Sequence, residues 1–229
     1  NAPLVNQGVL RFRVAPIVGG SFQNQAGATL RVLGDASLAI TTLTVLSGFT
    51  NSGVIELTSS NGVVAATLNV TTGSLVNAAG AQLNVLAGTG GTRTLGAQLD
   101  NQGTLTVSAA LTISKVSSDH LNGGTVDISG GNLTFTQTGT TPTITNTGTI
   151  NIGSNRTLTV SSGPFNNITP GVLQGIGTLD VSSASFTNAG NVNPGASPDR
   201  LSVTGVYNQT AAGALNVELA GTAAGTNYD

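Results

Sequence analysis

One repeated unit, apolar-x-Asn-x-Gly-x-apolar-x-apolar, returns along the whole chain and constrains its fold more than any other feature. The copies at Asn24 and Asn77 carry one extra residue before the glycine, and the copies at Asn122 and Asn167 are looser. Successive asparagines are 18, 27, 26, 24, 21, 24, 21 and 21 residues apart, with a mean near 23. Repeats of this length are typical of solenoids. The asparagines are Asn6, Asn24, Asn51, Asn77, Asn101, Asn122, Asn146, Asn167 and Asn188.

A second unit, apolar-x-apolar, falls between the asparagine copies, as in Leu43-Thr-Val45 and Leu158-Thr-Val160. Both units alternate apolar and polar residues, which is the period of a half-buried strand. Such short strands bury an apolar face only when each coil stacks on the next. The chain is therefore predicted to be all-β, a right-handed parallel β-helix with about 23 residues in each of roughly 8–10 coils.

The recurrent asparagine suits a corner between strands, because asparagine tolerates left-handed backbone and bonds to nearby backbone groups. We expect the nine side chains to form a structural column that bonds from coil to coil. The alternative is an asparagine-lined binding face. Only 7% of residues are charged, and stacking explains this, since like charges repeated about 4.8 Å apart would repel one another.

Composition argues against several classes of function. The seven Lys and Arg residues are scattered, so the clustered cations that bind nucleic acid are missing. The apolar runs are too short to cross a membrane. The chain has no cysteine and one histidine, His120, so a thiolate or two-histidine metal site cannot form, and no cofactor is expected.

Some β-helices cleave polysaccharides, and glycoside hydrolysis needs two nearby carboxylates. The best candidate pair is Asp100 and Asp127, because 27 residues approximate one coil. Lys115, Asp119 and His120 lie close in the sequence but are expected in a solvated loop. The expectation is that the chain has no catalytic residues.

Threonine alternates through Thr141–Thr149 and Thr134–Thr138, which raises the alternative of an ice-binding or polysaccharide-binding face. Such a face needs threonine at one position of many coils. Asn69, Asn84 and Asp180 occupy what look like comparable positions. Threonine on an outer face is also what strand propensity alone favours.

The segment from Asn193 to Gln209, NPGASPDRLSVTGVYNQ, resembles the Pro-Gly-x-Ser-Pro-Gly-x-Leu-x-Val-x-Gly-x-Tyr-x-Gln segment of bacterial autotransporter-like passengers and large repetitive surface adhesins. Asp199 replaces the glycine usual in that pattern, which leaves the turn type open. The specific likeness covers residues 193–229. It implies a secreted, non-catalytic right-handed β-helix.

Repeat and resemblance together lead to the expectation of a bacterial extracellular scaffold, an adhesin stalk or a fibre subunit. The alternative is a carbohydrate-binding or carbohydrate-cleaving β-helix, such as a lyase or tailspike. Residues 1–192 are expected to form the repeat coils and residues 193–229 to continue them. Expected partners are another copy docked head to tail or flanking domains of a longer chain, and surface glycans or host receptors.

Overall fold

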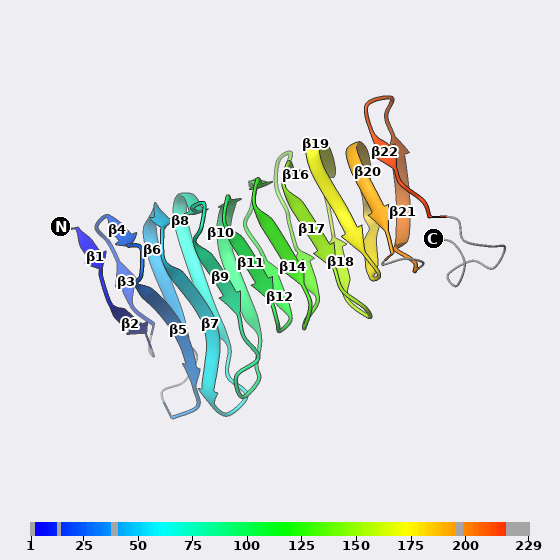
Figure 1. Cartoon of the computed structure of the whole chain (residues 1–229). Helices are drawn as coiled ribbons and strands as arrows, with labels where there is room; N and C mark the ends of the chain where they lie inside the picture. The colour runs from blue at the N-terminus through cyan, green and yellow to red at the C-terminus, as the bar shows by residue number, and fades with distance from the viewer. Residues whose placement is uncertain (1–2, 13–14, 38–40, 196–198, 219–229) are drawn as a thin grey trace.

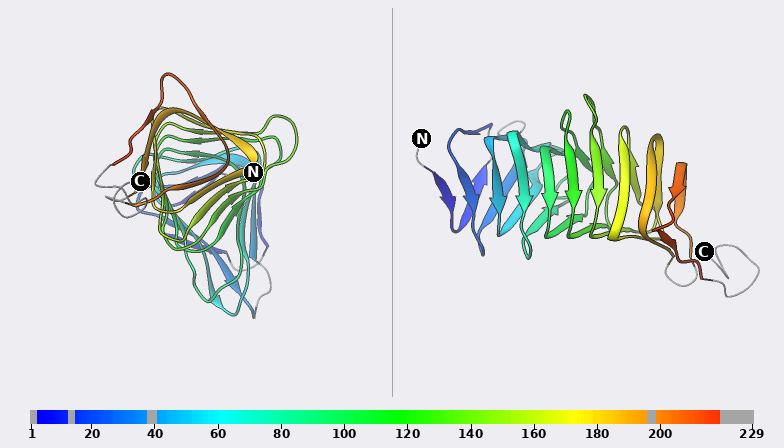
Figure 2. Two further views of the ribbon diagram at one scale, coloured as in Figure 1. Left: turned by 90° about the vertical axis from the view of Figure 1, so that its right-hand side faces the viewer. Right: turned by 90° about the horizontal axis from the view of Figure 1, so that it is seen from above.

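The protein folds as a parallel β-solenoid, seen from the side in Figure 1 and along its axis in Figure 2. The structure is a computed structural model that describes residues 3–12, 15–37, 41–195 and 199–218. These residues form 22 strands in about 8 turns of roughly 24 residues, and no helix. Every pairing between the strands is parallel, and the pairing usually joins one coil to the next, as at Asn51 and Asn77. The predicted fold class is confirmed.

The strands stack in three columns, which we call the first, second and third faces. The first face contains β1 (Leu4–Asn6), β4 (Phe22–Asn24), β13 (Asp119–Asn122) and β16 (Thr143–Asn146). The second contains β2 (Val9–Phe12), β5 (Thr29–Asp35), β7 (Val54–Asn61), β9 (Gln82–Val85), β11 (Thr104–Val107), β14 (Thr125–Ile128), β17 (Thr149–Ile152) and β22 (Ala214–Leu215). The third contains β3 (Ile17–Val18), β12 (Leu111–Ile113), β15 (Leu133–Phe135) and β18 (Thr157–Val160).

Six longer strands bend around a corner and so belong to more than one face. β6 (Thr41–Asn51), β8 (Ala66–Asn77), β10 (Arg93–Asn101), β20 (Thr178–Pro194) and β21 (Ser202–Gln209) start on the third face and continue onto the first, and β19 (Pro164–Gly175) joins the first to the second. At one such corner Gly73 has a φ of 71°. A side chain at its neighbour Gly48 would lie 2.7 Å from the carbonyl oxygen of Ser74. Glycine therefore lets successive coils approach closely where they turn.

The interior is built from apolar side chains that point inward at every second position. In the second face, Ile55, Leu83 and Leu105 are register neighbours and are fully buried. Aromatic rings stack in the first face, where the centroids of Phe165 and Phe186 lie 5.0 Å apart. The alternation seen in the sequence is thus the alternation between core and surface.

The early coils carry longer loops between the second and third faces, which project beyond the rest of the solenoid (Figure 1). They follow β5, β7 and β9, whereas the later coils turn more tightly. The segment expected to continue the solenoid begins within β20, and β21 and β22 pair in parallel with that strand. Residues 196–198 and 219–229 of that segment lie outside the described residues.

Candidate functional site

The structure brings all nine repeat asparagines into one buried column at the end of the first-face strands. Each side-chain Nδ2 donates a hydrogen bond to the Oδ1 of the asparagine one coil later, and the eight N–O distances lie between 2.6 and 2.8 Å. The column ends at Gln209, whose Oε1 accepts from Asn188 at 3.0 Å. We call this set of residues the asparagine ladder.

Each ladder carboxamide is also bonded to the backbone. The Nδ2 of Asn101 donates to the carbonyl of Thr125 at 3.0 Å, and Asn122 repeats this bond with Thr149 at 3.2 Å. In some coils the Oδ1 also accepts from the backbone amide two residues later, as Asn51 does from Gly53. The donors and acceptors of the column are thus used within the protein. It can join coils, but it offers no free group to a ligand.

Asp100 and Asp127, the best carboxylate pair for hydrolysis, are not stacked. Asp100 lies on the first face in register with Val76 and Leu121. Asp127 lies on the second face in register with Thr106 and Asn151, and its Oδ1 accepts a hydrogen bond of 2.8 Å from Asn151. The expected stacking is wrong because their spacing of one long step ignores that the coil between them has only 21 residues from Asn101 to Asn122.

Lys115, Asp119 and His120 do not share a solvated loop, so that expectation is also corrected. Lys115 donates to the carbonyls of Val70 and Thr71, at 2.8 and 2.7 Å. Asp119 is exposed and accepts from the Thr143 hydroxyl at 2.7 Å. His120 is the inward-facing residue of β13 and is only 4% exposed. The three side chains therefore have separate surroundings.

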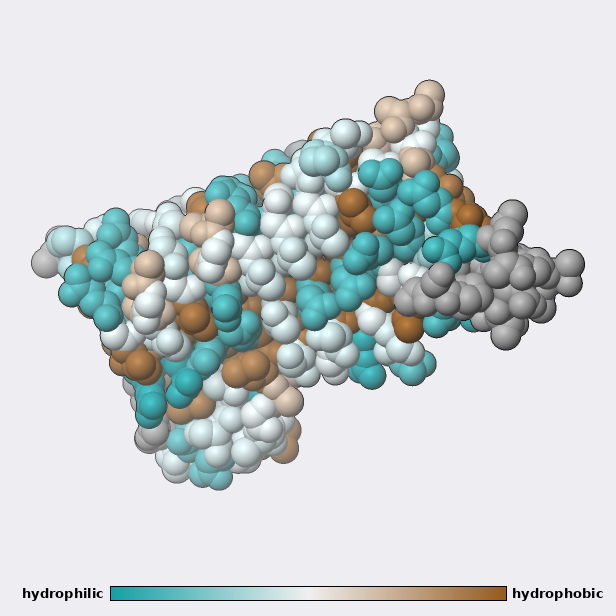
Figure 3. All heavy atoms as spheres, in the orientation of Figure 1, coloured by the Kyte–Doolittle hydropathy of each residue, from teal (hydrophilic) through white to brown (hydrophobic). Residues whose placement is uncertain are grey.

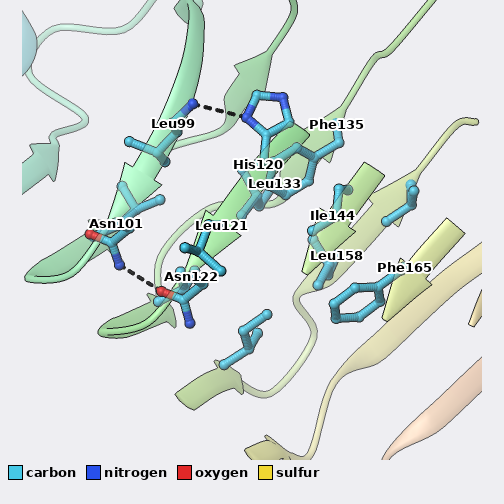
Figure 4. Close-up of a pocket in the computed structure, with 14 residues that line it drawn as sticks. Leu99, Asn101, His120, Leu121, Asn122, Leu133, Phe135, Ile144, Leu158 and Phe165 are labelled. Atoms are coloured by element: carbon cyan, nitrogen blue, oxygen red, sulfur yellow. Dashed lines mark hydrogen bonds between the residues drawn. The ribbon is translucent and has the colours of Figure 1, made fainter. Parts of the chain in front are cut away.

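His120 packs in the core beside a small cavity of about 20 Å³ (Figure 4). Its Nδ1 accepts a hydrogen bond of 3.1 Å from the Leu99 amide, so the neutral ring carries its proton on Nε2. Its ring centroid lies 5.2 Å from that of Phe135. Burial lowers the pKa of His120 to about 4, and the nearby Asp119 charge opposes this shift. The cavity is apolar and holds at most a water-sized guest, so it is no substrate site.

Arg93 is a buried cation that the sequence did not single out. It begins β10 as an inward residue, in register with Ala66 and Leu111, and is 1% exposed. Burial lowers its pKa. Its guanidinium donates to the Ser59 hydroxyl and to the carbonyls of Val64, Leu86, Ala87, Gly90 and Thr92, at 2.8 to 3.2 Å. Arg93 therefore fastens the long loops of two successive coils.

Outward threonines of the third face form a register-matched column, which we call the threonine row. Asn69 and Asn84 do not interrupt it, contrary to the expectation from the sequence. Asn69 is in register with Thr44 and Gly96, and Asn84 lies on the second face. Only Asp180 falls in the same column, beside Thr159. The row consists of Thr42, Thr67, Thr94, Thr112, Thr134 and Thr159.

Within the described part of the chain, no three His, Cys, Asp or Glu residues gather into a set able to hold a metal ion. The same residues include no helix that is long and apolar enough to span a membrane. The face seen in Figure 3 is a mixture of hydrophilic and neutral residues with small apolar spots. The surface columns are thus the remaining places where a ligand would bind.

Comparison with known proteins adds no identity: no family model, no curated protein and no solved structure matches the chain. The solenoid itself agrees with the β-helix that the adhesin-like resemblance implies. The relationship to autotransporter-like proteins is carried only by the sequence pattern from Asn193 to Gln209.

Proposed function

We propose that this chain is a non-enzymatic structural part of a bacterial extracellular protein, an adhesin stalk or a subunit of a fibre. The observation that carries the proposal is the asparagine ladder, which runs unbroken from Asn6 to Asn188. A buried polar network in which every member is satisfied makes a structure rigid and unique. Rigidity along one axis is what a stalk requires.

The chemistry of the exposed side chains supports a structural role. Candidate acids and bases are separated: Asp100 and Asp127 lie on different faces, and the ring of His120 is buried. The one ion pair among the described residues, Arg31 with Glu56, joins neighbouring coils in one column. These charged groups act between coils, as the asparagine ladder does.

The proposal of an extracellular role is tested on intact cells of the producing bacterium. Antibody against the folded chain is expected to label intact cells, and external protease is expected to remove the label. Labelling that requires cell lysis would contradict an extracellular location. Detection of a cytoplasmic protein after the same treatment controls for leakage.

The proposed lack of catalysis is tested with a panel of neutral and acidic polysaccharides. No shortening of any chain is expected. Cleavage that Asp100→Asn or Asp127→Asn abolishes would overturn the proposal, and Asp199→Asn serves as a matched control because Asp199 lies in another coil.

We also propose that the chain associates through its terminal coils, with a second copy or with flanking domains. Exposed apolar side chains at Val206 and Leu215, which are 57% and 49% exposed, support this. Unpaired strands with apolar side chains are templates for further strands. Light scattering is expected to show a mass that rises with concentration. A constant monomer mass that Val206→Lys leaves unchanged would contradict self-association.

A further inference from the structure

The threonine row is the most regular feature of the molecular surface. Its members come from β6, β8, β10, β12, β15 and β18, one from each of six successive coils. Neighbouring strands lie about 4.8 Å apart, so the row extends over roughly 24 Å. The buried partners between which it stands, such as Leu68 and Leu95, hold its backbone against the core.

The row presents a neutral array of hydroxyl and methyl groups. All six threonines are partly exposed, and none of their hydroxyls is bonded to another described side chain or backbone group. Threonine is branched at Cβ, so its χ1 angle is restricted and the array is held in place before any ligand arrives. Preorganisation of this kind lowers the entropy that binding costs.

Strand propensity alone does not account for the row, because the second face is a control within the same molecule. Its outward column passes through Glu56, Asn84, Thr106, Asp127 and Asn151. Those strands have the same parallel pairing and the same stacking, yet their outward residues differ in charge and size. Uniform threonine is therefore a property of the third face and not of the solenoid.

We infer that the threonine row is a binding site for the surface of ice. Along one axis of hexagonal ice the oxygen atoms repeat at a distance close to the strand spacing, so successive hydroxyls meet equivalent positions. Many weak contacts to one solid add together, as in any multivalent interaction. The row has no charge between Thr42 and Thr159 that would hold its own hydration shell, and Asp180 marks its end.

A polysaccharide is the competing ligand, and the side chains of this face do not favour it. Sugar rings are commonly bound on aromatic side chains that offer an apolar face. The rings of Phe22, Phe49, Phe135, Phe165 and Phe186 are all buried in the core. The row lacks such a platform, while an array that repeats with the coils suits a crystalline ligand.

The test compares two substitutions in the same coil. Thr112→Lys places a long charged side chain in the threonine row, and Thr106→Lys places the same side chain on the second face. The wild-type chain and the Thr106→Lys variant are expected to show thermal hysteresis and to partition into a growing ice hemisphere. Thr112→Lys is expected to lose most of both, at least tenfold in the concentration required.

Circular dichroism and melting temperature establish that both variants are folded, and Thr134→Lys provides a second disruption of the row. Three results would overturn the inference: a wild-type chain without affinity for ice, equal loss in Thr112→Lys and Thr106→Lys, or binding to cellulose or chitin that the row variants abolish while ice affinity is absent. None of these bears on the scaffold role, which is tested separately on cells.

Discussion

At the scale of single residues, the asparagine ladder converts one repeated letter of the sequence into a continuous chain of buried hydrogen bonds. Asn101 accepts from Asn77 at 2.8 Å and donates to Asn122 at 2.7 Å, with no exposed surface of its own. Removing one member therefore leaves a donor above and an acceptor below without partners. The cost of such a change comes mainly from these stranded groups.

Asn101→Leu is expected to lower the free energy of unfolding by about 2–5 kcal/mol, because two or more buried polar groups lose a partner at about 1–3 kcal/mol each. Urea unfolding followed by circular dichroism measures the change. Gln102→Leu, on the exposed side of the same strand end, is the matched control and is expected to change stability by less than about 0.5 kcal/mol. Equal effects of the two substitutions would contradict a structural ladder.

His120 is expected to make the fold sensitive to acid. Its pKa is about 4 in the folded chain and near 6.5 in a free side chain. Between these values the unfolded chain takes up a proton that the folded chain does not, so stability is complete above pH 6.5 and falls as the pH approaches 4. The loss amounts to about 3 kcal/mol at about 1.4 kcal/mol for each pKa unit.

Urea unfolding at pH 7 and at pH 4.5 tests this, with His120→Phe as the comparison. Phenylalanine fits the position, because Phe165 and Phe186 occupy it in later coils. The carboxylates titrate in both proteins, so the difference between them isolates the histidine. A His120→Phe variant with the same loss of stability as the wild type would show that burial of His120 is not the cause.

At the scale of elements, Arg93 joins the loops that lead into and out of the long early coils. It bonds to groups between Ser59 and Val64 in one coil and between Leu86 and Thr92 in the next. A planar guanidinium with five N–H donors suits such a ring of carbonyls, whereas the lysine ammonium has three donors on a single atom.

Arg93→Lys is therefore expected to loosen these loops and to lower the free energy of unfolding by at least about 1.5–3 kcal/mol, the value of one charged hydrogen bond. Amide hydrogen exchange is expected to increase first in residues 86–92. Arg156→Lys is the control, because Arg156 is partly exposed and its guanidinium makes two long bonds to the carbonyls of Gly130 and Ser154. Similar exchange in the two variants would rule out a clamp at Arg93.

The strands and the ladder were predictable because the same residue returns at the same corner of each coil. Arg93 was not, because no asparagine copy stands near it to show that it points inward. His120 had an available signal: it lies two residues before Asn122, where other copies carry apolar residues such as Phe165 before Asn167. Unequal coil lengths hid the threonine row, since spacing alone could not assign Asn69 and Thr94 to different columns.

At the scale of the whole molecule, each coil contacts only its neighbours, so stability is expected to be a sum of coil terms and terms between adjacent coils. The ladder gives a direct test, because its members are chemically identical and differ only in separation. Asn101 bonds to Asn122 in the next coil. Asn167 stands two coils further along, beyond Asn146.

Double-mutant cycles with leucine at these positions are expected to separate the two cases. Asn101→Leu and Asn122→Leu should couple by about 0.5–3 kcal/mol, because the first substitution already strands the group that the second removes, whereas Asn101→Leu and Asn167→Leu should add within about 0.5 kcal/mol. Urea unfolding of the four variants in each cycle provides the values. Equal coupling in both cycles would mean that the ladder acts as one cooperative unit, and that a local defect weakens the rod over its entire length.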